Sequence, residues 1–288
     1  MQLNDTKFML LQHGQNDDLK QPYRINENVL LKQSESARDL GIQVDSELKF
    51  KIQRDTCTTS ASQVAGWTLR VFRSRSKEVM LVLYKSLIRP KIEYGCMVFN
   101  PHEIGEISKL ESVQRNFTHK IENMESLNYW ERLQSLGLYS TQRRRERFIC
   151  IQMFKIYKEL IPNNLNLQFY QTPRQGPMCR RKKLIAKSAR ANSLRCNSFS
   201  DVGAKLFNIL PKQLKDSKTK ESFKRKLDHM LSKLPDRPPI QGYVRQNDNS
   251  IWDWLRSERI SSIAELDDDE EESHETEVEE ASLTQPCP

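Results

Sequence analysis

Glycine is scarce in this chain, which contains only nine glycines in 288 residues. Tight turns in sandwiches and doubly wound sheets often need glycine, so its scarcity argues against those classes and favours a mainly helical fold. Hydrophobic residues make up 37% of the chain and charged residues 29%. That composition allows one large domain, or two smaller ones, with real hydrophobic cores.

Long apolar runs are also missing from the sequence. No run approaches the ~20 residues that a membrane-spanning helix needs, so no membrane partner is expected. The opening residues MQLNDTKFMLLQHG lack the basic start and the long apolar stretch of a signal peptide. We therefore expect an intracellular protein, in the nucleus or the cytoplasm.

The residue clusters that usually accompany metals and cofactors are absent as well. The six cysteines include no Cys-x-x-Cys pair, and the five histidines have no ligand-like spacing to them, so no metal or other cofactor is expected. Phosphate-binding loops and nucleophile elbows are also missing. Two carboxylate clusters remain, Asp17-Asp18 in a polar turn and Asp267–Asp269 near the C-terminus. Neither lies on the rigid, partly buried frame of a two-metal site, so the chain is predicted not to be an enzyme on its own.

Positive charge is the strongest compositional signal, although the net charge of +8 conceals it. The stretch from Glu265 to Glu280 holds eleven acidic residues and no Lys or Arg. Residues 1–264 then hold 46 basic residues against 27 acidic ones, a formal charge of +19. Nucleic acid is the commonest partner of such a body, and an anionic membrane surface is the main competitor. The acidic stretch near the C-terminus either keeps the protein soluble or competes with nucleic acid for the basic body.

Residues 1–50 differ in pattern from the rest of the chain. Short apolar or alternating runs, separated by polar turns, predict an N-terminal ribbon of three or four short antiparallel strands that packs on the helices after it. The helical part is expected to span 51–161. It starts with a helix over Lys51–Arg75, followed by a helix over 77–95 that is interrupted at Pro90, whose missing N–H disfavours continuation.

A third helix is predicted to start at Asn100 and to run to about Met124. Asn100 suits an N-cap, Pro101 suits the first turn, and Glu103 stands three residues after Asn100, as in a capping box. Apolar residues three and four apart then predict one buried face.

Two more helices complete the predicted part up to residue 161. The pattern over Tyr129–Leu136 predicts a short helix, with Gly137 as its C-terminal cap. Ser140 is expected to cap a long helix that ends at about Ile161, before Pro162.

The remainder is predicted to contain a basic linker over 162–199, a C-terminal helical region over 200–256 and a disordered acidic tail over 257–288. The linker holds eight basic residues and no acidic one. The helical region is expected to begin at a Ser200 cap, to continue with the helix KESFKRKLDHMLSKLP, and to pack Trp252 and Trp254 back onto the body.

Two arginine-rich groups are the candidate nucleic-acid-binding residues. Successive helical residues turn by about 100°, so Arg143 and Arg147 share a face while Arg145 points elsewhere. One alternative is that some of these arginines pair with acids such as Glu131 or Glu111; the other is that they contact phosphate. The second group is either a solvated loop or import signal, or a direct nucleic-acid contact. The full candidate set is Arg143, Arg144, Arg145, Arg147, Arg180, Arg181, Lys182 and Lys183.

Several motifs in order resemble the C-terminal half of reverse transcriptases from non-LTR (LINE, Jockey-like) retrotransposons. The matching stretches are LNDTKFML, ARDLGIQVDSELKF, LYKSLIRPKIEYGCMVFNP, ESVQRNFTHKI, LNYWERLQSLGLYSTQRRRER, FNILPKQLKDSKTKESFKRKLD and the pair PDRPPIQGY and NSIWDWL. The resemblance covers residues 3–255, and it departs from the family pattern at Phe99 and at Phe148-Ile149. It implies the last strands of the palm followed by a thumb-like helical bundle, with the catalytic carboxylates expected ahead of Met1.

These observations lead to one main expectation and two alternatives. The main expectation is a non-catalytic, reverse transcriptase-like fragment that binds the RNA or DNA backbone with low specificity. A separate polymerase is a candidate partner of such a fragment. The first alternative is a protein-interaction adaptor whose acidic tail engages a basic protein. The second is a degraded element without a selected function.

Overall fold

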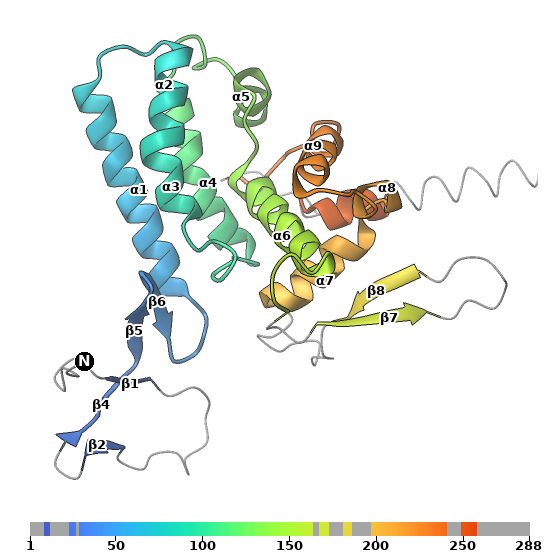
Figure 1. Cartoon of the computed structure of the whole chain (residues 1–288). Helices are drawn as coiled ribbons and strands as arrows, with labels where there is room; N and C mark the ends of the chain where they lie inside the picture. The colour runs from blue at the N-terminus through green and yellow to red at the C-terminus, as the bar shows by residue number, and fades with distance from the viewer. Residues whose placement is uncertain are drawn as a thin grey trace, which may run out of the picture.

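The computed structural model describes residues 9–11, 23–26, 29–163, 167–172, 181–185, 197–240 and 249–257. Its described part is mainly helical, with a small β-structure at the N-terminus, which confirms the predicted fold class (Figure 1). The predicted acidic tail lies outside these residues. No helix in the described ranges is both long enough and apolar enough to cross a bilayer.

The N-terminal strands form three two-stranded pairs. The β2–β3 and β5–β6 pairs are antiparallel as predicted, whereas β1 and β4 run parallel. The strands are β1 (Met9–Leu11), β2 (Arg24–Asn26), β3 (Val29–Leu30), β4 (Lys32–Ser34), β5 (Ser36–Asp39) and β6 (Ile42–Asp45).

The β5–β6 hairpin joins the strands to the helices. Its turn residues Leu40 and Gly41 both have positive φ, as a tight two-residue hairpin requires. The Tyr94 hydroxyl donates to the carbonyl of Leu40 at 2.6 Å, and the Gln43 amide donates to Oε1 of Gln53 at 2.7 Å. The hairpin therefore packs on the helices that follow it, as expected.

The first helical group surrounds one hydrophobic cluster. Met80, Tyr84, Ile88, Phe117 and Ile121 are among its fully buried members. The group consists of α1 (Lys51–Val71), α2 (Lys77–Leu83), the π-helix η3 (Tyr84–Ile88), α3 (Arg89–Glu93), α4 (Ile104–Thr118) and α5 (Tyr129–Leu136).

The expected break at Pro90 is replaced by a change of helical register. A π-helical turn, η3, joins α2 to α3, and Pro90 occupies the first turn of α3. An α-helical turn ahead of Pro90 would press the ring against the carbonyl four residues earlier, and the wider π turn relieves that contact. The chain therefore stays helical through residue 93.

The predicted start of α4 was wrong. The helix begins at Ile104, and Glu103 takes the N-cap position without a side-chain cap. Asn100 lies four residues before this start, and its Oδ1 accepts a hydrogen bond from Nε of Arg145 at 3.2 Å. The helix ends at Thr118, earlier than expected.

The predicted boundaries around α5 and the next helix, α6 (Thr141–Tyr157), hold at all but one end. Asn128 and Glu131 form a capping box at the start of α5, and Gly137 ends it with φ of 61°. Oγ of Ser140 accepts from the Arg143 amide at 3.0 Å, which confirms the predicted N-cap of α6. The helix ends at Tyr157, before the expected Ile161.

The second helical group has its own hydrophobic cluster, to which α6 contributes. Phe154 stacks on Phe223 with ring centroids 4.2 Å apart, and Trp252 and Trp254 pack against this cluster as predicted. Since α6 belongs to this cluster, the expected division after residue 161 does not coincide with the division between the two clusters. The remaining elements are α7 (Phe199–Ile209), α8 (Lys212–Lys215), α9 (Lys220–Leu231) and a helical stretch over 251–257.

Two details of this region differ from expectation. The N-cap of α7 is Ser198 and not Ser200, which lies inside the helix. The predicted linker contains the antiparallel pair β7 (Gln168–Thr172) and β8 (Arg181–Ile185). The aromatic and aliphatic residues in those two short runs favour strands, whereas the polar and basic residues around them are typical of a linker.

Candidate nucleic-acid interface

Helix α6 lies between the two helical groups and carries four of the candidate arginines in its first two turns (Figure 1). Its apolar residues Ile149, Met153 and Phe154 are fully buried in the second cluster. On its other side, Phe148 packs against Cys96 and Phe99, which precede α4. The arginines therefore emerge at the seam between two packed bodies and not on an open helix face.

Arg143 is fully buried and does not reach the surface. Its Nη2 donates to the carbonyl of Pro235 at 2.8 Å and to that of Asn249 at 3.3 Å. Beside it, Asp236 accepts from both the amide and the hydroxyl of Ser140 at 2.7 Å. These contacts fasten the segment after α9 to the start of α6, so Arg143 acts structurally in this conformation.

Arg145 is buried too, on the side facing the first helical group. Its Nε donates to Oδ1 of Asn100, and its Nη1 donates to Oγ1 of Thr141 at 3.1 Å. The predicted nucleic-acid role of Arg143 and Arg145 therefore has no support in this geometry. A guanidinium enclosed by protein cannot contact a phosphate unless the surrounding segments move.

Glu111, one of the two acids named as possible arginine partners, lies in the same buried network. Its carboxylate accepts from the Tyr129 hydroxyl at 2.7 Å, from Oγ1 of Thr141 at 2.7 Å and from the Gln142 amide at 2.8 Å. Burial raises the pKa of Glu111, and the charge of Arg145 acts in the opposite direction. Glu131, the other acid, instead belongs to the capping box of α5.

Arg144 and Arg147 reach the surface in part, and both border an open pocket of about 270 Å³. Arg144 pairs with Glu93 of α3 through both oxygens of that carboxylate. Arg147 pairs with Asp228 of α9, with Nε to Oδ1 at 2.5 Å and Nη2 to Oδ2 at 2.7 Å. The pocket therefore lies where α3, α6 and α9 meet.

Two further cations of this pocket come from η3 and α3 and were missed by the sequence predictions. The side chains of Lys85 in η3 and Arg89 in α3 line it together with Arg147 of α6 and Asp228 of α9. The only local signal was their spacing of four residues, and the π turn that sets their direction was not predicted. The complete lining is Tyr84, Lys85, Arg89, Gly137, Leu138, Tyr139, Arg144, Arg147 and Asp228.

Positive charge exceeds negative charge around this pocket. Glu93 serves two guanidinium groups, because Nε of Arg89 lies 3.8 Å from the same carboxylate that pairs with Arg144. Burial and the neighbouring Arg144 lower the pKa of Arg89, while Glu93 partly offsets them. Within the described part of the chain, exposed Lys85 makes no hydrogen bond or ion pair. Four cations thus face two carboxylates, a formal surplus of two positive charges.

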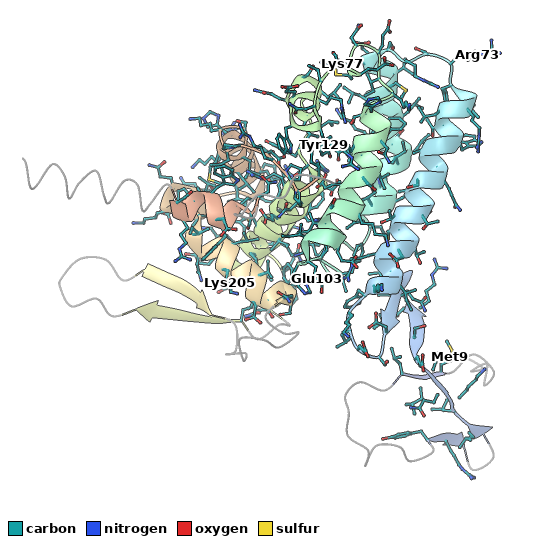
Figure 2. The ribbon with its side chains drawn as sticks, turned by 180° about the vertical axis from the view of Figure 1, so that it is seen from behind. Met9, Arg73, Lys77, Glu103, Tyr129 and Lys205 are labelled. Carbon is teal, nitrogen blue, oxygen red and sulfur yellow. The ribbon has the colours of Figure 1, made fainter. Side chains whose placement is uncertain are left out.

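The second group of candidate residues lies elsewhere. Arg181, Lys182 and Lys183 belong to β8, where they pair in register with Thr172, Gln171 and Tyr170 of β7. Both views place this hairpin on the opposite side of the molecule from α1, whereas the first group belongs to α6, which lies between them in Figure 1 (Figures 1 and 2). Arg180 lies outside the described residues.

No sign of a metal centre accompanies this site. In the described ranges, no three His, Cys, Asp or Glu side chains are grouped so as to hold a metal ion. Asp17 and Asp18, the carboxylate pair weighed from the sequence, lie outside those ranges. The expectation of a non-catalytic chain stays a prediction.

Comparisons with known proteins give one distant relative. A stretch of 126 residues, 43% of this chain, is 27% identical to an uncharacterized protein of Caenorhabditis elegans. The match spans 62% of the length of that protein. No protein-family profile and no solved structure matches the chain. The resemblance to reverse transcriptases therefore also stays a prediction.

Proposed function

We propose that this chain binds the phosphate backbone of RNA or DNA without sequence specificity, as a non-catalytic, reverse transcriptase-like thumb region. One observation carries the proposal: Lys85, Arg89, Arg144 and Arg147 converge on one open pocket. Among the described residues that line it, Asp228 is the one carboxylate, and Glu93 pairs with two of the arginines beside it. The surplus positive charge lines a concave pocket and is partly desolvated there. It therefore attracts an anion more strongly than the same charges would on a convex surface.

The dimensions of the pocket suit a phosphate group. A volume of about 270 Å³ is too small for a folded partner but admits one phosphate with its sugar neighbours. Arginine forks match phosphate oxygens bidentately, and a lysine adds a mobile point charge. Contacts of this kind fix the position of the backbone and carry no direct sequence information, which supports low specificity.

Lys85 provides the sharpest test because it is exposed and has no partner in the described residues. Its replacement by Ala should weaken binding to fluorescein-labelled oligonucleotides of any sequence, with little effect on folding. The slope of log affinity against log salt should become shallower by about 1, as expected for one lost phosphate contact. Fluorescence anisotropy across a salt series measures both quantities.

Lys51→Ala is the matched control, because Lys51 is an exposed lysine at the start of α1 that does not line the pocket. The control should leave affinity and salt slope unchanged. Equal losses in the two variants would show diffuse charge attraction without a site at the pocket. If the unmodified protein does not bind the oligonucleotides even at low salt, the proposed function is refuted.

A further inference from the structure

The end of α1 presents an exposed surface that the pocket does not explain. Trp67, Val71 and Phe72 are 49%, 53% and 36% exposed, and Arg70 and Arg73 beside them are exposed as well. Trp67, Arg70 and Val71 stand three and four residues apart, so they share one face of the helix. Figure 2 places Arg73 at one end of the molecule, with Lys77 at the same end. We call these five residues, 67 and 70–73, the α1 tip.

The charge at the α1 tip is of one sign. No acidic residue occurs between Asp55 and Glu78, whereas four basic residues lie there. Two of the four serve the fold. Nη2 of Arg75 donates to the carbonyl of Leu69 at 2.6 Å and so caps the C-terminus of α1. Nζ of Lys77 donates to the carbonyl of Ser135 at 2.6 Å and ties the start of α2 to α5.

The other two, Arg70 and Arg73, are the basic residues of the tip itself and remain available. In the described part of the chain, Arg70 and Arg73 make no hydrogen bond or ion pair. Each stands next to an exposed aromatic ring or within a helical turn of one, since Arg73 follows Phe72 and Arg70 lies three residues after Trp67. Aromatic faces beside free guanidinium groups are the combination that binds unpaired bases and their phosphates together.

We propose that the α1 tip binds unpaired nucleotides, with bases stacked on Trp67 and Phe72 and phosphates held by Arg70 and Arg73. This inference rests on the proposed function and adds that the preferred ligand contains a single-stranded segment. The interleaving of rings with arginines favours nucleic acid over a lipid surface, which would fit an uninterrupted apolar face better. Arginine also stacks on planar bases in a way that lysine does not.

The position of the tip fits one strand that contacts both surfaces. Lys77, beside the tip, and Lys85, in the pocket, lie eight residues apart in the helix that runs through α2 into η3. Eight residues correspond to about 12 Å of helical rise. At the duplex spacing of about 3.4 Å per nucleotide, roughly four nucleotides of one strand bridge that distance. A strand held in the pocket can therefore reach the tip.

The experiment compares Trp67→Leu with Trp67→Phe. Leucine keeps apolar surface but removes the aromatic face, and phenylalanine keeps a face for stacking. Affinity for a single-stranded oligothymidine and for a duplex is measured by fluorescence anisotropy. Trp67→Leu should weaken single-strand binding by about tenfold, the loss expected for one stacked base, and should leave duplex binding unchanged. Trp67→Phe should stay close to the unmodified protein.

Ile52→Ala is the matched control, because Ile52 is similarly exposed on α1 but at its opposite end. It should bind both oligonucleotides normally. Circular dichroism melting curves verify that all variants fold. The inference is overturned if Trp67→Leu binds the single strand as well as Trp67→Phe does. It is overturned equally if the tip instead binds phosphatidylserine vesicles and Trp67→Leu leaves single-strand affinity intact.

The Lys85→Ala variant separates the two proposals. If it weakens binding of both oligonucleotides while Trp67→Leu weakens neither, the backbone site stands and the stacking site falls. If the unmodified protein binds neither oligonucleotide at low salt, both proposals fall together.

Discussion

Replacement of Asp228 by Asn should make the protein less stable and, at the same time, a stronger nucleic-acid binder. Asp228 is the carboxylate that lines the pocket in the described part of the chain, and it holds Arg147 through two parallel hydrogen bonds of 2.5 and 2.7 Å. The substitution keeps the shape of the side chain and removes its negative charge. The charge of Asp228 therefore stabilises the fold and weakens the binding of nucleic acid.

The size of each effect follows from exposure and charge. The side chains of Arg147 and Asp228 are 17% and 39% exposed, so solvent screens the pair and its contribution to the free energy of unfolding is about 1 kcal/mol. On the binding side, the formal surplus in the pocket rises by one positive charge. The slope of log affinity against log salt should then steepen by about 1, and affinity should rise most at low salt.

Arg147→Gln supplies the matched comparison. It breaks the same ion pair and should cost a similar free energy of unfolding, but it removes a cation, so the salt slope should become shallower by about 1. Urea denaturation measures the first quantity, and anisotropy titrations at several salt concentrations measure the second. If both variants lose affinity in proportion to their loss of stability, the pocket is a structural joint and not a phosphate site.

Two further predictions concern stability. Burial raises the pKa of Glu111, so this carboxyl keeps its proton to higher pH in the folded state than in the unfolded state. The free energy of unfolding of the unmodified protein, measured relative to Glu111→Gln, should therefore fall as the pH rises from the ordinary glutamate pKa to the raised one. A difference between the two proteins that does not depend on pH would contradict this account. Gly95→Ala should cost roughly 2–4 kcal/mol in denaturant unfolding, because Gly95 has φ of +66° and an added Cβ would lie 2.5 Å from Cδ1 of Ile42. Gly105→Ala is its control, since nothing lies within 4 Å of a Cβ at Gly105, and an equal loss there would refute the argument.

Local features of the fold were predicted well because they depend on neighbouring residues. Ser140 caps α6 through the amide three residues later, and Gly137 ends α5 with the positive φ that glycine tolerates. The prediction of a capped start at Asn100 failed for the opposite reason. The side-chain oxygen of Asn100 accepts from Arg145, 45 residues further along the chain, and the helix begins only at Ile104.

The candidate site shows the same division. The sequence alone predicted a basic body and pointed to the arginines of α6, because charge and composition do not depend on how the chain folds. It could not tell which arginines face outward. Their carboxylate partners lie 51 residues away for Arg144 and 81 residues away for Arg147, and only packing brings them together.

Tertiary structure therefore decided the role of each charge. It buried Arg143 and Arg145 between the two helical groups, left Arg144 and Arg147 at a pocket, and added Lys85 and Arg89 through a π turn. The physical reason is that a charged side chain is buried or exposed according to the surfaces that meet around it, and those surfaces come from distant parts of the chain. Composition determined how much positive charge this protein carries, and packing determined where that charge can meet a phosphate.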